Sequence, residues 1–267
     1  MLKNLIGALT SALLISPTPA AEALKVGFVY VSPIGQAGWT YQHDQARLAM
    51  SRTLGAKVQT RYVEAVPEGA DAERVMREMA ADGTTLIFAT SFGYLEPALR
   101  VAGDFKGVAF EHAGGYKIAP NLNTYNARFY EGRWLAGWLA GKASQSGVAG
   151  YVAGFPLPEV IQGINAFALG MRAANPNATV RVAWLGTWFD PPKEREAALA
   201  LIGGGADVLA NHSGSPAVPQ TAQERGVKVI GYQSDMRAHA PNAQLAAVTA
   251  DWSGYYASVA RAVQAGH

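Results

Sequence analysis

From Leu24 onward, short runs rich in β-branched and aromatic residues alternate with longer runs in which apolar residues recur at helical spacing. The first series of such runs predicts strands at residues 25–31, 56–64, 85–90, 108–111 and 121–126, with helices at 40–54, 70–81 and from about 96. Strands separated by helices of this length form βαβ units, so we expect a parallel sheet flanked by helices.

A second series with the same layout begins with an amphipathic helix at 128–143. It predicts strands at 148–153, 179–184, 208–210, 227–232 and 245–249, with helices at 160–174, 191–203 and 215–225. We therefore predict two α/β lobes, residues 24–127 and 128–251, joined by short hinges near 126–128 and 250–252 and separated by a cleft. Residues 252–267 start a helical return to the first lobe, and we expect this return to be incomplete because the sequence is short there.

The N-terminus has the pattern of a secretory signal. Residues 1–4 are positively charged, residues 5–15 form an apolar core too short to span a bilayer, and small residues follow, with cleavage options near Ala21 or Ala23. We predict a signal peptide over residues 1–23 and a periplasmic location. The alternative is an uncleaved membrane anchor or a buried N-terminal helix.

Cysteine content and charge narrow the class of protein. The chain has no cysteine, which excludes disulfides, thiolate metal sites, a cysteine nucleophile and a lipid-modified N-terminal cysteine. We therefore expect a freely soluble periplasmic protein without a lipobox cysteine. The net charge is only +2 and no basic run occurs, which argues against a nucleic-acid surface.

Catalytic signatures are missing from the sequence. It contains no phosphate-binding loop, zinc-protease motif or nucleophile elbow, and the segment Gly147–Gly154 does not fit dinucleotide spacing. The 5 histidines include no helical i, i+4 pair, so a metal site has little support. We predict a binding protein rather than an enzyme, with no cofactor and no metal.

Aromatic and polar residues recur where predicted strands end, in both lobes. Open α/β sheets hold their ligands at the carboxyl ends of their strands, so these residues should line the cleft. The candidates are Trp39, Tyr41, Phe92, Trp188, Phe189, His212, Asp235 and Trp252.

Flat rings with few polar groups suit a planar ligand that is polar at its edges. We expect Trp39 and either Trp188 or Phe189 to sandwich a heteroaromatic base, while Asp235 accepts its N–H groups. Ordinary core packing is the alternative for each tryptophan. Asp190 precedes two prolines and fits a helix N-cap better than a ligand contact.

Five segments together resemble the basic membrane protein family, the PnrA-like substrate-binding proteins of ABC transporters. They are LGTWFDPPKEREAA at 185–198, GADVLANHSGSP at 205–216, ERGVKVIGYQSDM at 224–236, YEGRWLAGWLAG at 130–141 and VAGFPLPEVIQGIN at 152–165. The resemblance runs from Val26 to the end of the chain, with the motifs in the right order. It implies a two-lobed periplasmic-binding-protein fold of type I, purine-type ligands, and delivery to an ABC permease in the inner membrane.

The resemblance also implies roles for individual residues. The family's first stacking aromatic aligns with Trp39, its second with the segment Thr187–Pro191, and its carboxylate with Asp235. Nucleoside binders of the family usually have a ribose-holding lysine where this chain reads Asp251-Trp252. We therefore expect a free purine base such as adenine, bound by a monomer. The alternatives are a purine nucleoside, a sugar-type ligand, a sensor role, or an exported nucleoside hydrolase.

Overall fold

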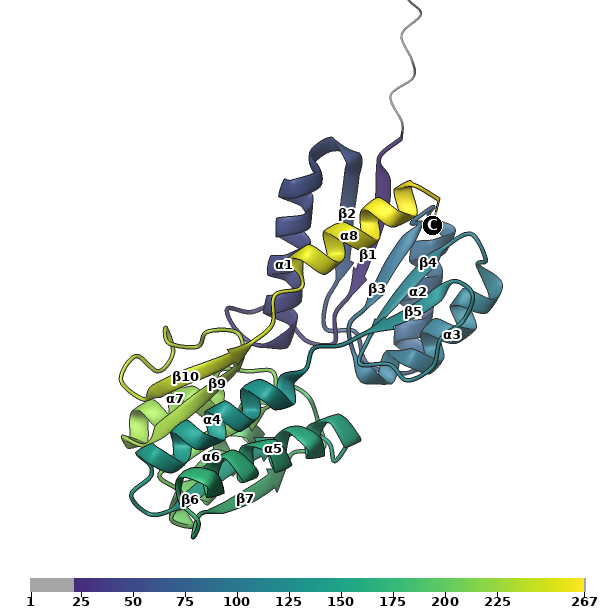
Figure 1. Cartoon of the computed structure of the whole chain (residues 1–267). Coiled ribbons are helices and arrows are strands. Elements are labelled where there is room, and N and C mark those ends of the chain that lie inside the picture. The colour runs from purple at the N-terminus through teal and green to yellow at the C-terminus, as the bar shows by residue number, and fades with distance from the viewer. Residues whose placement is uncertain (1–21, 267) are drawn as a thin grey trace, which may run out of the picture.

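The computed structural model describes residues 22–266 of the chain (Figure 1). Most of the predicted signal peptide, residues 1–21, lies outside the described residues. Between residues 22 and 266, no helix combines the length and the apolar character needed to cross a membrane.

The first sheet contains five parallel strands in the order β2-β1-β3-β4-β5. Neighbouring side chains of its central strands point to opposite faces. Phe28 and Phe88 stack at 4.8 Å on the face covered by α1 and α8, whereas Val29 and Ile87 pack on the face covered by α2 and α3. We call this unit the N-lobe; its elements are β1 (Leu24–Val29), α1 (Trp39–Leu54), β2 (Val58–Val63), α2 (Ala70–Ala81), β3 (Leu86–Ala89), α3 (Leu95–Asp104), β4 (Ala109–Ala113) and β5 (Leu122–Tyr125), with 3-10 turns η1 (Gly55–Lys57) and η2 (Phe92–Tyr94).

The second sheet repeats this architecture with the order β10-β9-β8-β6-β7, again all parallel. Helices α4 and α5 pack closely on each other over one face, and α6 and α7 pack on the other (Figure 1). We call this unit the C-lobe; its elements are α4 (Phe129–Ala143), β6 (Val148–Ala153), α5 (Pro158–Ala174), β7 (Thr179–Trp184), α6 (Pro191–Gly203), β8 (Val208–His212), α7 (Ala217–Arg225), β9 (Lys228–Gln233) and β10 (Gln244–Thr249).

The chain returns to the N-lobe through α8 (Ser253–Gln264), which lies beside α1 (yellow in Figure 1). Tyr256 packs against Phe88 with ring centroids 4.2 Å apart, and the Tyr255 hydroxyl donates to Glu111 at 2.7 Å. The predicted α/β fold with two parallel sheets and a helical return is therefore confirmed. The two crossings between lobes lie between β5 and α4 and between β10 and α8, while the lobe boundaries themselves stay a prediction.

Candidate functional site

A cavity opens between the lobes at the carboxyl ends of strands from both sheets. Its volume is about 660 Å³, including the part open to solvent. The strand-end rule therefore locates the cavity correctly. Its lining residues are Val31, Ser32, Trp39, Ser91, Phe92, Ala113 and Gly114 from the N-lobe, and Leu157, Glu159, Val160, Trp188, His212, Ser213, Gly214, Tyr232 and Gln233 from the C-lobe.

Trp39 forms part of the N-lobe wall at the first residue of α1. Its indole Nε1 donates to the Thr90 carbonyl at 2.5 Å, and its ring meets His43 edge-on at 4.2 Å. Burial lowers the pKa of His43 to about 3, so this imidazole is neutral at physiological pH. The indole therefore rests on an uncharged support and is held within its own lobe.

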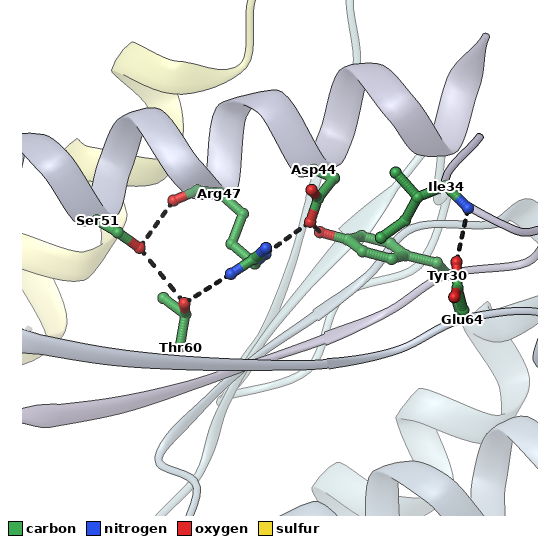
Figure 2. Close-up of polar contacts among 7 residues, drawn as sticks. All are labelled: Tyr30, Ile34, Asp44, Arg47, Ser51, Thr60 and Glu64. Atoms are coloured by element: carbon green, nitrogen blue, oxygen red, sulfur yellow. Dashed lines mark hydrogen bonds and ion pairs between the residues drawn. The ribbon is translucent and has the colours of Figure 1, made fainter. Parts of the chain in front are cut away.

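A polar network fixes α1, the helix that begins at Trp39, and the loop before it to the sheet (Figure 2). Asp44 on α1 accepts from the Tyr30 hydroxyl at 3.3 Å and from Arg47 Nε at 2.7 Å. At the start of the loop, the Ile34 amide donates to Glu64 at 2.7 Å. These hydrogen bonds hold the loop and the start of α1 in place, so the position of Trp39 does not depend on a ligand.

Trp188 forms the facing wall, on the connection between β7 and α6. Its Nε1 donates across the cleft to Glu68 Oε1 at 3.1 Å, and its ring meets Phe155 edge-on at 4.9 Å. Glu68 is already held in the N-lobe by the Ser91 hydroxyl at 2.6 Å and the Gly93 amide at 2.9 Å. Trp188 therefore links the two lobes over the cavity.

The lobes also meet at Gly38, immediately before Trp39. Its amide donates to the Ser234 hydroxyl of the C-lobe at 2.8 Å. Its φ is +93°, and a Cβ at this position would lie 2.1 Å from the Gly214 carbonyl oxygen. Only glycine permits both this backbone conformation and this approach of the lobes.

The loop that carries Trp188 is fixed at its far end by a helix cap. Asp190 Oδ1 accepts from the Lys193 amide at 3.1 Å, which confirms the predicted N-cap. In return the Asp190 amide donates to Glu194 at 3.2 Å. The buried Glu194 also accepts from the hydroxyls of Ser213 at 2.8 Å and Ser215 at 2.7 Å, so it ties the two cavity loops together.

Four of the eight predicted site residues line the cavity: Trp39, Phe92, Trp188 and His212. Phe92 lies on η2 beside Tyr116, with ring centroids 5.9 Å apart. The pKa of His212 lies well below its ordinary value, because burial and the nearby Arg133 charge both disfavour the imidazolium. His212 therefore presents a neutral ring to the cavity.

The other four predicted residues lie elsewhere. Tyr41 follows Trp39 by two positions on α1, which turns it to another side of the helix. Phe189 packs against Gly214 instead of lining the cavity. Trp252 is only 5% exposed and stacks on His43 at 5.2 Å, within the aromatic core.

Asp235, the predicted carboxylate, is held in a turn at the surface. Its side chain is 58% exposed and accepts from Gln244 at 2.6 Å and from the Arg237 amide at 3.0 Å. These bonds lower its pKa, and Asp235 is not among the residues that line the cavity. Its role in binding stays a prediction that the geometry does not favour.

Glu159 is the carboxylate that lines the cavity, and the sequence analysis missed it. It lies in the first turn of α5, where the helix dipole favours a negative charge, and its Oε2 accepts from Asn126 at 3.1 Å. Burial raises its pKa. The signal available in the sequence was the Pro-Glu helix start directly after the strand at 148–153.

Metal and cofactor ligands form no recognisable cluster. Within residues 22–266, no group of three or more His, Asp or Glu side chains is placed to hold a metal ion. The cavity walls instead supply two indole rings, a phenyl ring, a neutral imidazole and a carboxylate. This set can bind a planar ligand by stacking and hydrogen bonding.

Comparison with known proteins agrees with this geometry. The family described as "ABC transporter substrate-binding protein PnrA-like" matches residues 23–267. A protein of Brucella abortus named as purine-binding is 52% identical over 244 residues, covering 91% of this chain and 70% of its own length. A protein of Haloferax volcanii, provisionally named as an ABC transporter glucose-binding protein, is 43% identical and covers 88% of this chain and 60% of its own length.

A solved structure supports the fold. A solute-binding protein of an ABC transporter system from Conexibacter woesei superposes with a TM-score of 0.72 at 25% identity. The superposition covers 91% of this chain and 82% of the Conexibacter chain.

Proposed function

The chain belongs to the PnrA-like family of ABC transporter substrate-binding proteins, and we propose that it captures a free purine base of the adenine type in the cavity between its lobes. The observation that carries the proposal is the pair of tryptophans, Trp39 and Trp188, which line one cavity from opposite lobes beside a half-buried carboxylate. The name of the Brucella relative supports the same ligand class.

Stacking supplies much of the binding energy in this proposal. Each base–aromatic contact contributes about 1–3 kcal/mol on the scale measured for nucleic-acid binders. Phe92 can extend the N-lobe surface beside Trp39. Rings of this kind bind any planar base, so discrimination among bases has to come from polar groups at the edge.

Glu159 is our candidate for that discrimination. A carboxylate accepts hydrogen bonds from ligand N–H groups, and the exocyclic amino group of adenine can donate one to it. Gln233 adds an amide at the end of β9, and its Oε1 is buried without a partner among the described residues. A ligand N–H can donate to this oxygen, which favours binding because a buried acceptor without a hydrogen bond is unfavourable in free energy.

The absence of a ribose-holding lysine is the reason for favouring a base over a nucleoside. Asp251 caps α8 by accepting from the Ser253 amide at 2.9 Å, and Trp252 is part of the core. Neither residue lines the cavity. We keep a purine nucleoside as the alternative ligand within the same site.

Export and delivery complete the proposal. The predicted signal sequence at residues 1–23 directs the chain to the periplasm, where the monomer closes on its ligand by hinge bending and passes it to an ABC permease. No chemical step on the ligand is required. Incubation with inosine should therefore release no free base, and release would favour the nucleoside hydrolase alternative.

Calorimetric titration of purified protein, first unfolded and refolded to remove retained ligand, tests the ligand class. We expect adenine to bind most tightly among adenine, guanine, hypoxanthine, adenosine and glucose. Glucose is included because of the name of the Haloferax relative. Tight glucose binding without purine binding would overturn the proposal, and tighter binding of adenosine than adenine would shift it to the nucleoside.

A further inference from the structure

A second cavity adjoins the first beneath the crossing from β5 to α4. Its volume is about 550 Å³, including the part open to solvent, and it shares Glu159, His212 and Tyr232 with the first cavity. The rest of its wall includes the crossing segment 126–130 and Arg133 on α4. The two cavities therefore share part of one wall.

Arg133 is a buried cation with most of its hydrogen-bonding capacity unused. The side chain is 0% exposed, and Nη2 donates to the Asn211 carbonyl at 2.8 Å. Nε and Nη1 have no hydrogen-bond partner among the described residues. The guanidinium lies 3.5 Å above the Tyr232 ring, and the Tyr232 hydroxyl is also unpartnered.

No charge in the described part of the chain neutralises Arg133. Arg128 on the same cavity wall is paired with Glu131, and Glu159 accepts from Asn126 instead of forming an ion pair with Arg133. Charged side chains are almost never fully buried unless they are paired. The aromatic contact offsets part of this cost, but it supplies no acceptor for Nε or Nη1.

We propose that the second cavity is an oxyanion subsite, in which an unpartnered N–H of Arg133, at Nε or Nη1, binds a phosphate or carboxylate group. Nε–H and Nη1–H lie on different edges of the guanidinium, so either can donate a charge-assisted hydrogen bond to such a group, and the unpartnered Tyr232 hydroxyl can donate another. The oxyanion is either a free inorganic anion bound beside the proposed free base, or a phosphate substituent, in which case the ligand is a nucleotide rather than a base. Anion binding by Arg133 is independent of the proposed function. Only the idea that the anion lies beside, or is joined to, a purine in the first cavity rests on that function.

Thermal unfolding of the ligand-free protein with inorganic phosphate tests the subsite without any purine. At saturating phosphate, compared with sodium chloride of equal ionic strength, the wild-type midpoint should rise by at least about 2 °C. Arg133→Met should abolish this rise and fold normally, because replacing a buried charge with an apolar residue of similar size is often neutral or stabilising. Arg195→Met, which removes an exposed arginine on α6, should respond to phosphate as wild type does.

Calorimetry then identifies the source of the oxyanion. If it belongs to the ligand, adenosine 5′-monophosphate should bind wild type at least about tenfold more tightly than adenosine, and Arg133→Met should lose the difference. If it is free, phosphate should strengthen adenine binding to wild type but not to Arg133→Met. Arg133→Lys keeps the charge but places it on a compact ammonium group at a different position, and it should retain a smaller anion effect.

Two outcomes would overturn the subsite: no phosphate effect on wild type, or equal phosphate effects on wild type and Arg133→Met. Each would reduce Arg133 to a packing residue. Adenine titration without phosphate measures the proposed function separately, so either idea can fail while the other stands.

Discussion

The two walls of the cleft hold their tryptophans in different ways. Trp39 donates to Thr90 of its own lobe, and its supporting helix is clamped to the sheet through Asp44 (Figure 2). Trp188 instead donates across the cleft to Glu68. The N-lobe ring is therefore a preorganised platform, whereas the C-lobe ring completes its contacts only when the lobes meet. Trp39 can stack on a ligand whether the lobes are open or closed, whereas the contribution of Trp188 to affinity depends on closure.

Replacement of Trp188 should have the largest effect on ligand affinity. Trp188→Ala removes a stacking surface and the link to Glu68, so adenine affinity should fall about 100-fold, from about 1–3 kcal/mol of stacking plus one hydrogen bond. Phe189→Ala is the matched control, since its ring packs on Gly214 outside the cavity. Calorimetry decides between them. A larger loss for Phe189→Ala would make Phe189 the stacking ring.

Closure itself can be blocked at Gly38. The Cβ of Gly38→Ala would clash with the Gly214 carbonyl, so the variant should bind adenine at least about tenfold more weakly and remain open in small-angle X-ray scattering with ligand. Gly35→Ala is the control, because Gly35 also has positive φ, +57°, but nothing lies within 4 Å of its Cβ position. Equal losses in both variants would mean that backbone strain, and not the approach of the lobes, is responsible.

The two candidate carboxylates can be separated next. Glu159→Gln should weaken adenine binding about tenfold, because a charge-assisted acceptor becomes a neutral amide. Asp235→Asn should change the affinity less than about twofold, since this side chain is exposed and bonded to Gln244. The opposite ranking in a titration series would restore Asp235 to the site.

The buried imidazole of His112 in the N-lobe should make the stability of the protein depend on pH. His112 on β4 is fully buried, and burial lowers its pKa to about 4. Only the unfolded chain binds this proton between pH 6.5 and 4, so His112 lowers the free energy of unfolding by up to about 1.4 kcal/mol per pH unit as pH falls.

The effect is isolated by comparing wild type with His112→Leu in urea at pH 7.5 and 5. The buried carboxyl of Glu111 has a raised pKa and acts in the opposite direction, but its contribution is common to both proteins and cancels. The stability difference between the proteins should move in favour of the variant at pH 5. A difference independent of pH would mean that the imidazole protonates in the folded state.

The smallest effect is expected at the cap of the C-lobe loop. Asp190→Ala removes the bond to the Lys193 amide and should lower the free energy of unfolding by about 1 kcal/mol. Adenine affinity should change little, because Asp190 does not line the cavity. A loss of affinity comparable to that of Trp188→Ala would place Asp190 in contact with the ligand.

Much of the fold follows from local pattern. The predicted strands at 148–153 and 179–184 and helices at 70–81 and 191–203 coincide with the observed bounds. Hydrophobic periodicity and helix caps involve residues close together in sequence, so these elements can be predicted from local sequence alone. The strand-end rule placed Trp39 and Trp188 at the cavity for a similar reason, because it depends only on strand direction.

Tertiary structure decided which of the predicted side chains reach the cavity. Phe189 and Trp188 are adjacent in sequence, yet their rings take different surroundings, and Asp235 is drawn to the surface by Gln244 on β10. Glu159 gains its position from Asn126, 33 residues earlier in the chain. Local sequence determined where strands and helices run, whereas the meeting of two lobes determined which groups face one another, because such contacts join residues that no local pattern connects.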